Sequence, residues 1–189
     1  MRAFIGISLQ QGVRETLGGL QRDLGLSRAD VKWVRPENIH LTIRFLGNIT
    51  ELGRDNITAA LRGRCSTIEP FSLILKGTGT FPNSKNPKVI WAATEHSDPM
   101  LKLHADIEKA LTETGFKPEE RPFTPHLTLG RVGSSCGSKE LAEKIIMHKE
   151  DKFGIISVDS VCLIKSELTP DGAIYSLLGE ILLQGKSSQ

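Results

Sequence analysis

The chain has 189 residues, of which 39% are hydrophobic and 24% are charged, and its formal net charge is +2 with a sequence pI near 8.5. These values are typical of a soluble globular domain. They exclude a strongly basic protein that binds nucleic acid through its overall charge, whereas a local site for an anionic substrate stays open.

Cysteine and hydropathy patterns indicate the compartment. Cys65, Cys136 and Cys162 are far apart and form no Cys-x-x-Cys pair, which predicts free thiols in a reducing interior rather than a disulfide framework or a zinc site. The apolar run at the N-terminus is too short for a signal peptide, and no run approaches the ~18 residues of a membrane helix. We therefore expect a cytoplasmic protein with no membrane partner.

Strands and helices alternate through the first half of the chain. Apolar, β-prone runs predict strands, and apolar residues three and four positions apart predict helices. We expect strands at 2–9, 39–47, 71–77 and 88–94, and helices at 11–24 and 51–63. The turn-forming sequence FPNSKNP joins the last two strands into a hairpin. The expected buried stripe of the second helix consists of Leu52, Ile57, Ala60 and Leu61.

The second half repeats this alternation. Asp98 is expected to cap a helix over 99–114, and a strand follows Pro125. A helix at 138–150 and strands at 154–165 and 173–184, joined by the turn LTPDGA, complete the chain. The order βαβαββ and then αβαββ predicts an α+β fold with two pseudo-symmetric lobes, whose antiparallel sheets face a central cleft. Because no long linker divides the chain, we expect residues 1–189 to form a single domain.

A tetrapeptide occurs twice, as HLTI beginning at His40 and as HLTL beginning at His126. Each copy lies on a predicted strand shortly after a proline. Side chains alternate between the two faces of a strand, so His40 shares a face with Thr42, and His126 shares one with Thr128. If a pseudo-twofold axis relates the lobes, these two pairs face each other across the cleft.

Two facing histidines are suited to acid–base chemistry near neutral pH, because the pKa of a free imidazole is about 6.5. One neutral ring takes a proton from a nucleophile, and one protonated ring gives a proton to a leaving oxygen. Threonine hydroxyls can donate hydrogen bonds to anionic oxygens. A phosphodiester needs all of these groups, and none of them requires a metal. The structural alternative is that His-x-Thr is simply common on strands and that the histidines are core residues.

The segments around the two tetrapeptides resemble a known family. WVRPENIHLTIRFLGNI, at 33–49, and RPFTPHLTLGRV, at 121–132, are similar to the two signature segments of the 2H phosphoesterase superfamily. Within it, the chain most resembles the bacterial and archaeal RNA 2′,3′-cyclic phosphodiesterases, historically called 2′-5′ RNA ligases. The resemblance extends to the start RAFIGISL, the Phe81-Pro82 loop and the strand PKVIW, so it covers most of the chain.

This resemblance implies a bilobal fold that hydrolyses a terminal 2′,3′-cyclic phosphate of RNA to a 2′-phosphate, without metal or cofactor. It implies that His40 is the proton donor and His126 the proton acceptor, and that Thr42 and Thr128 bind phosphate. It also implies a phosphate contact from Arg131. We expect a monomer that acts on RNA ends, of which tRNA halves are one example.

Arg131 conflicts with simple strand alternation, because its odd number places it on the face opposite to the second histidine–threonine pair. Gly130 offers a solution, since glycine in a strand often marks a bulge that re-aims the next side chain. Arg44 shares the face of His40 and is a second candidate cation. Either arginine could instead be solvated.

The remaining histidines and aromatic residues give weaker signals. His96, His104 and His148 are expected to have no catalytic role, and His148 is expected to interact with a helix dipole. The sequence contains no HExxH pattern, which would predict a metal site, and no P-loop, which would predict ATP-driven ligation. Trp33 and Phe81 are candidates for stacking on bases, although most aromatic residues of this chain should be in the core.

Three other functions stay open at the level of the sequence. The same groups could run the reversible formation and cleavage of 2′-5′ linkages. A small cyclic nucleotide or an ADP-ribose cyclic phosphate is another candidate substrate within the superfamily. A module that binds RNA ends without catalysis is the non-enzymatic alternative.

Overall fold

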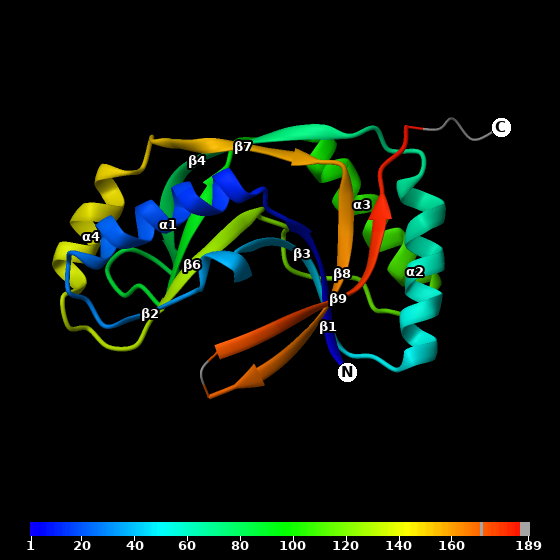
Figure 1. The fold of residues 1–189 in the computed structure, drawn as a ribbon, viewed down its shortest axis with the longest axis horizontal. Coiled ribbons are helices and arrows are strands. Elements are labelled where there is room, and N and C mark those ends of the chain that lie inside the picture. The colour runs from blue at the N-terminus through cyan, green and yellow to red at the C-terminus, as the bar shows by residue number, and fades with distance from the viewer. Residues whose placement is uncertain (171, 186–189) are drawn as a thin grey trace.

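The computed structural model describes residues 1–170 and 172–185, whose arrangement is shown in Figure 1. In chain order the elements are β1 (Arg2–Ser8), α1 (Gln11–Gly25), β2 (Val31–Trp33), the 3₁₀ helix η1 (Pro36–Asn38), β3 (His40–Asn48), α2 (Glu51–Cys65), β4 (Phe71–Phe81), β5 (Val89–Thr94), α3 (Asp98–Glu113), β6 (His126–Val132), α4 (Ser138–Met147), β7 (Lys152–Val158), β8 (Ser160–Thr169) and β9 (Gly172–Leu182). The predicted order of helices and strands is confirmed apart from the region around residue 159 and from the short β2 and η1, which are additional.

The strands form one curled antiparallel sheet in the order β7-β4-β5-β6-β3-β1-β8-β9, with the short β2 paired to β6. In its middle, β3 and β6 share a single residue pair, Leu41 opposite Leu127. The sheet therefore consists of two parts that meet at this pair. Helices α1 and α4 pack on β7 and β4 in one part, whereas α2 packs on β9 and α3 in the other. Figure 1 shows the two helix pairs at opposite ends of the molecule. The predicted α+β architecture with two lobes is confirmed.

The lobes do not coincide with the two halves of the sequence. The α1/α4 lobe contains β2, β4, β5, β6 and β7, and the α2/α3 lobe contains β1, β3, β8 and β9. The single strand predicted at 154–165 is wrong, because β7 pairs with β4 while β8 pairs with β1. The chain crosses between the lobes at Asp159, which separates these two strands. Asp159 and Ser160 interrupt the apolar pattern at this crossing, but two polar residues inside a β-prone run do not by themselves predict a change of lobe.

The helices bury their predicted faces with local exceptions. In α2, Ile57 and Leu61 are fully buried, but Leu52 in the first turn is 71% exposed, so its place in the buried stripe is wrong. The N-cap of α3 is Ser97 rather than Asp98, since the Ser97 hydroxyl accepts a hydrogen bond from the amide of Met100. Helix α4 ends at Met147, earlier than predicted.

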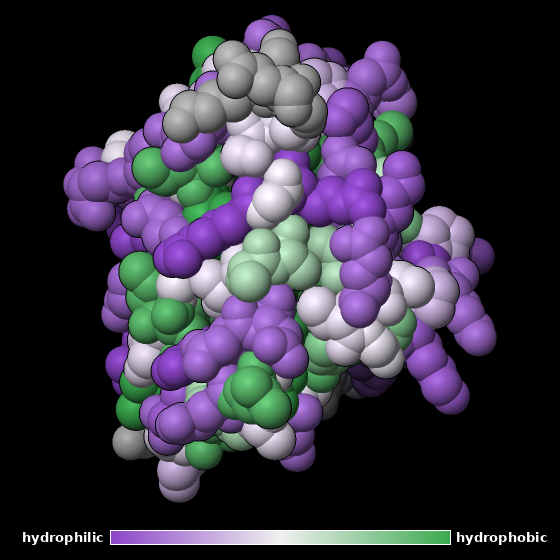
Figure 2. Space-filling model, turned by 90° about the vertical axis from the view of Figure 1, so that its right-hand side faces the viewer, coloured by the Kyte–Doolittle hydropathy of each residue, from purple (hydrophilic) through white to green (hydrophobic). Residues whose placement is uncertain are grey.

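The hairpin of β8 and β9 is confirmed, although Asp171 of its predicted turn lies outside the described residues. The outer face of the α2/α3 lobe is mostly hydrophilic, with hydrophobic side chains in separate small patches (Figure 2). No helix in residues 1–170 or 172–185 is long and apolar enough to cross a membrane. All three cysteines are free thiols, and Cys136 is exposed.

Candidate active site

The two tetrapeptides open β3 and β6 and meet where the lobes join. Leu41 and Leu127 pair across the junction, and both are fully buried. Because the strands are antiparallel, this register sets the histidine of each tetrapeptide beside the threonine of the other. The four polar side chains are partly exposed on the face opposite to the buried leucines, as strand alternation predicts.

Both imidazoles are held in the same way. Nδ1 of His40 lies 2.7 Å from the carbonyl oxygen of Asn38, and Nδ1 of His126 lies 2.7 Å from that of Thr124. A carbonyl can only accept a hydrogen bond, so Nδ1 carries the proton in each ring. Nε2 of each ring is thus the atom that exchanges a proton with a ligand. Neither carbonyl contact was predicted from the sequence.

Aromatic side chains enclose His40. The ring of Phe4 stacks on it at a centroid distance of 4.4 Å, and the ring of Tyr175 meets it edge-on at 5.1 Å. Burial lowers the pKa of His40, although the hydrogen bond to the Asn38 carbonyl acts in the opposite direction. Sequence reasoning missed Phe4 and Tyr175, because they come from β1 and β9, far from His40 in the chain.

His126 has more open surroundings. Phe81 presents its ring to His126 in an edge-on arrangement with centroids 5.0 Å apart, and Trp91 does so at 6.4 Å. Phe81, a sequence candidate for base stacking, therefore contacts the histidine and is not among the described residues that line the neighbouring cleft.

A cleft of about 480 Å³ lies between β2, η1, the start of β3 and the β8–β9 hairpin. His40, Thr42 and Thr128 line it, and Trp33, the other candidate for base stacking, lies in its wall. His126 stands outside this lining, at the position in β6 that the register sets beside Thr42. The cleft thus opens onto the junction from the side of His40.

A bulge in β6 brings Arg131 into the cleft. Thr128 and Gly130 pair with consecutive residues of β5, so Leu129 is an extra residue in β6. Leu129 and Gly130 are both buried, and alternation resumes one position later. Arg131 consequently lines the same cleft as Thr128, as the bulge predicted at Gly130 requires.

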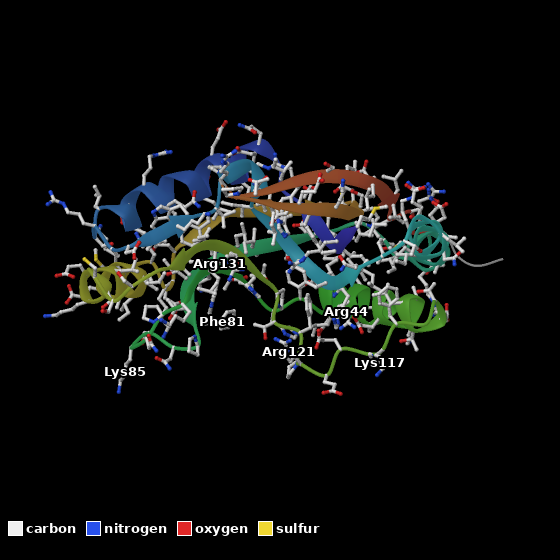
Figure 3. All side chains as sticks on the ribbon, turned by 90° about the horizontal axis from the view of Figure 1, so that it is seen from below. Arg44, Phe81, Lys85, Lys117, Arg121 and Arg131 are labelled. Carbon is white, nitrogen blue, oxygen red and sulfur yellow. The ribbon has the colours of Figure 1, made fainter. Side chains whose placement is uncertain are left out.

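Arg44 has a different role from the one considered for it. Its guanidinium donates a hydrogen bond of 2.7 Å to the carbonyl of Lys117 and lies 3.0 Å from Glu119 and 3.5 Å from Glu108. It therefore fastens β3 to α3 and to the segment after it. Figure 3 shows Arg44 beside α3, well away from Arg131.

The family of this chain follows from its similarity to known proteins. Residues 14–170 match the model of the 2′-5′ RNA ligase superfamily. The chain belongs to this superfamily. The resemblance inferred from the two tetrapeptide segments is confirmed.

Relatives of this superfamily member align over almost its full length. A protein of Methanothermobacter thermautotrophicus named RNA 2′,3′-cyclic phosphodiesterase is 35% identical over 176 residues, which are 93% of this chain and 95% of that one. The protein of the same name from Methanocaldococcus jannaschii is 34% identical over 180 residues, 95% and 99% of the two chains.

Solved structures share the fold. A crystal structure from Thermus thermophilus superposes with a TM-score of 0.83 at 28% identity and covers 99% of this chain and 100% of that one. Escherichia coli LigT complexed with 3′-AMP superposes with a TM-score of 0.79, covering 96% of this chain and 97% of that one, at 21% identity. At that identity the likeness concerns the fold alone.

The other three histidines of this 2′-5′ RNA ligase superfamily member are not among the described residues that line the cleft. His96 pairs with Asp98, and the ring of His104 stacks on Phe123 at 4.1 Å. His148 is at the C-cap of α4, as predicted, but its partners are the carboxylates of Asp23 and Asp151. Burial alone would lower its pKa, yet these carboxylates outweigh it and raise the pKa of His148. These contacts give the three histidines structural partners outside the cleft.

Within the described part of the chain, no group of three or more histidine, cysteine or acidic side chains is placed to hold a metal ion.

Proposed function

We propose that the chain hydrolyses the terminal 2′,3′-cyclic phosphate of RNA to a 2′-phosphomonoester, with His40 as proton donor and His126 as proton acceptor. One observation carries the proposal. Both imidazoles are fixed through Nδ1 by a carbonyl two residues earlier, so each presents Nε2 at the junction of β3 and β6. The names of the aligned relatives supply the substrate class.

In the proposed reaction, water attacks phosphorus and the bond from phosphorus to the 3′ oxygen breaks. Nε2 of His126 takes a proton from the water, and Nε2 of protonated His40 gives a proton to the leaving 3′ oxygen. The hydroxyls of Thr42 and Thr128 donate hydrogen bonds to the non-bridging oxygens, and Arg131 offsets the charge that develops there. His126 thus gains the proton that the water loses, and His40 loses the proton that the 3′ oxygen gains. The two rings end with exchanged protonation states, and proton exchange with solvent restores them.

The environment of His40 bears on its role as donor. Burial lowers its pKa in the free protein, which favours the neutral ring. A bound phosphodiester brings a negative charge close to this ring, and a nearby opposite charge favours the protonated form. Substrate binding and protonation of His40 are therefore coupled in this proposal.

The first test uses an oligoribonucleotide with a 2′,3′-cyclic phosphate end in the presence of excess EDTA. The wild-type protein should release the 2′-phosphomonoester. His40→Ala and His126→Ala should each lower kcat by roughly 10²–10⁴, the usual contribution of one general acid or base. His96→Ala is the matched control, because this histidine is exposed and lies outside the junction, and its kcat should equal that of the wild type.

Full activity in both alanine variants would remove the histidines from the mechanism. A 3′-phosphomonoester product would show that the bond from phosphorus to the 2′ oxygen breaks instead of the bond to the 3′ oxygen. Turnover that stops when EDTA removes divalent ions would contradict the metal-independent scheme, and tight binding without turnover would favour an RNA-end binding module.

We further propose RNA ends, tRNA halves among them, as the cellular substrates, and a monomer as the active form. His40, Thr42, His126 and Thr128 meet within a single chain, so the proposed chemistry needs no residue from a second copy. Free thiols, one of them exposed, fit a reducing compartment, and we propose the cytoplasm.

A further inference from the structure

The cleft carries more positive charge than one reacting phosphate requires. Arg2, Lys32, Arg35 and Arg131 line it, and no carboxylate is among its described lining residues. The chain as a whole is nearly balanced, with 24 basic and 22 acidic residues. The cations are thus concentrated locally, and a cleft lined by charges of one sign attracts ligands of the opposite sign.

Two of these cations are neighbours on adjacent strands. Lys32 on β2 pairs in register with Arg131 on β6. Cross-strand partners project from the same face of a sheet, and like charges at such positions are destabilising. An anion bound between them relieves this repulsion.

The cationic groups are available for a ligand. Nζ of Lys32 contacts the carbonyl oxygen of Pro170 at 3.5 Å, which directs the ammonium across the cleft toward the β8–β9 hairpin and leaves two of its three donors. Lys32, Arg35 and Arg131 are exposed. In the ranges that the structure describes, none of the three takes part in an ion pair.

We propose that Lys32 and Arg35 form a second phosphate subsite beside Arg131, which binds the phosphodiester on the 5′ side of the terminal nucleotide. This inference rests on the proposed function, because the cyclic phosphate defines which nucleotide is terminal. It makes a dinucleotide or longer RNA the preferred substrate over a mononucleotide 2′,3′-cyclic phosphate. Arg131 belongs to the reacting phosphate, and the second subsite begins at its cross-strand neighbour.

Other exposed cations are less well placed for this task. Figure 3 shows Lys85, Lys117 and Arg121 on loops that lie away from the β8–β9 hairpin. Arg121 is 3.8 Å from Glu119, which offsets its charge. None of the three is among the described residues that line the cleft. They therefore provide a contrast for the experiment.

The test compares two substrates, adenosine 2′,3′-cyclic phosphate and the dinucleotide ApA with a 2′,3′-cyclic phosphate end. The wild-type protein should prefer the dinucleotide in kcat/KM. The double substitution Lys32→Ala with Arg35→Ala should reduce this preference about tenfold, the effect of losing charge-assisted hydrogen bonds at an exposed site. Salt should also weaken dinucleotide turnover less steeply, with a log–log slope smaller by about one for each phosphate that the variant no longer neutralises.

Three further variants separate this subsite from the rest. Arg131→Ala should lower kcat/KM for both substrates by the same factor. Lys32→Arg keeps the charge and should keep the preference. Arg62→Ala removes an exposed cation of α2 that does not line the cleft, and should change neither value.

An unchanged preference in the double variant, or an equal loss on both substrates, would overturn the subsite. Loss of the preference in Arg121→Ala instead would place the RNA on the loop of Arg121, outside the cleft, with the same consequence. Wild-type protein that hydrolyses neither substrate would refute the proposed function. Equilibrium binding then tests the subsite independently, since 2′-phosphorylated ApA should bind more tightly than 2′-AMP, and only the double variant should lose that difference.

Discussion

At the scale of single residues, the two histidines share a backbone geometry but not an environment. Nδ1 of each ring is 2.7 Å from the carbonyl oxygen two residues earlier. Phe4 and Tyr175 enclose His40, whereas His126 meets Phe81 edge-on beside a more open surface. Burial lowers the pKa of His40 because an apolar environment disfavours the charged ring. The enclosing rings thus give one histidine of a near-symmetric pair its own proton affinity.

Tyr175→Ala should raise the pKa of His40 toward about 6.5, the value of a free imidazole, because removal of the ring exposes His40 to water. Tyr175→Phe keeps the ring and should leave the pKa low. The ring-proton resonances of the histidines report this in an NMR titration, with His40→Gln to identify the signal. A His40 pKa equal in Tyr175→Ala and in the wild type would mean that the tyrosine ring does not cause the shift.

At the scale of elements, the bulge in β6 and the packing of β2 decide where Arg131 points. A Cβ atom on Gly130 would lie 2.7 Å from Cγ1 of Val31 and 2.9 Å from Cε3 of Trp33, so β2 closes over this glycine. β2 also carries Lys32, opposite Arg131. One close approach between two strands therefore positions both the bulge and the cationic wall of the cleft.

Gly130→Ala should lower the free energy of unfolding by about 1–3 kcal/mol, because an extra methyl group in a packed site forces its neighbours to shift. It should also lower kcat/KM, since the displacement re-aims Arg131. Gly63→Ala is the matched control, as a Cβ there has no neighbour within 4 Å in α2, and it should stabilise the protein by about 0.5–1 kcal/mol. Urea denaturation measures both effects, and a Gly130→Ala protein as stable as the wild type would contradict this packing.

At the scale of the whole molecule, the two lobes are interleaved along the chain and joined through one sheet. The chain passes from the α1/α4 lobe to the α2/α3 lobe at Asp159. The buried residues form one main hydrophobic cluster that includes Leu73 of β4 as well as Ile5 of β1. A smaller cluster of Phe4, Cys162 and Ile164 lies within the α2/α3 lobe, but the main cluster spans both lobes, so we expect them to fold together.

Trp33 and Trp91 both belong to the α1/α4 lobe, and this makes the cooperativity testable. Tryptophan fluorescence follows that lobe, while far-UV circular dichroism follows both. A cooperative unit gives coincident transitions by different probes. The two denaturation curves should therefore share one midpoint, and a separate fluorescence midpoint would show that the lobes unfold independently.

Local patterns predicted the helices and strands because their periods depend on neighbours in the chain. They failed where contact with a segment far away in the sequence decides burial or strand pairing. Leu52 has helical spacing but lies in the first turn of α2, where no other element covers it. The stretch at 154–165 is mostly apolar and β-prone on both sides of Asp159, yet its two ends pair with strands of different lobes.

The two histidine–threonine pairs that open β3 and β6 mark what the sequence determined by itself. Strand alternation placed each histidine with its threonine, and Gly130 indicated the bulge. Tertiary structure decided the register at Leu41 and Leu127, the rings around His40, and the meeting of Lys32 with Arg131. Alternation follows from the geometry of one strand, whereas register, burial and the field of neighbouring charges depend on which distant segments the fold brings together.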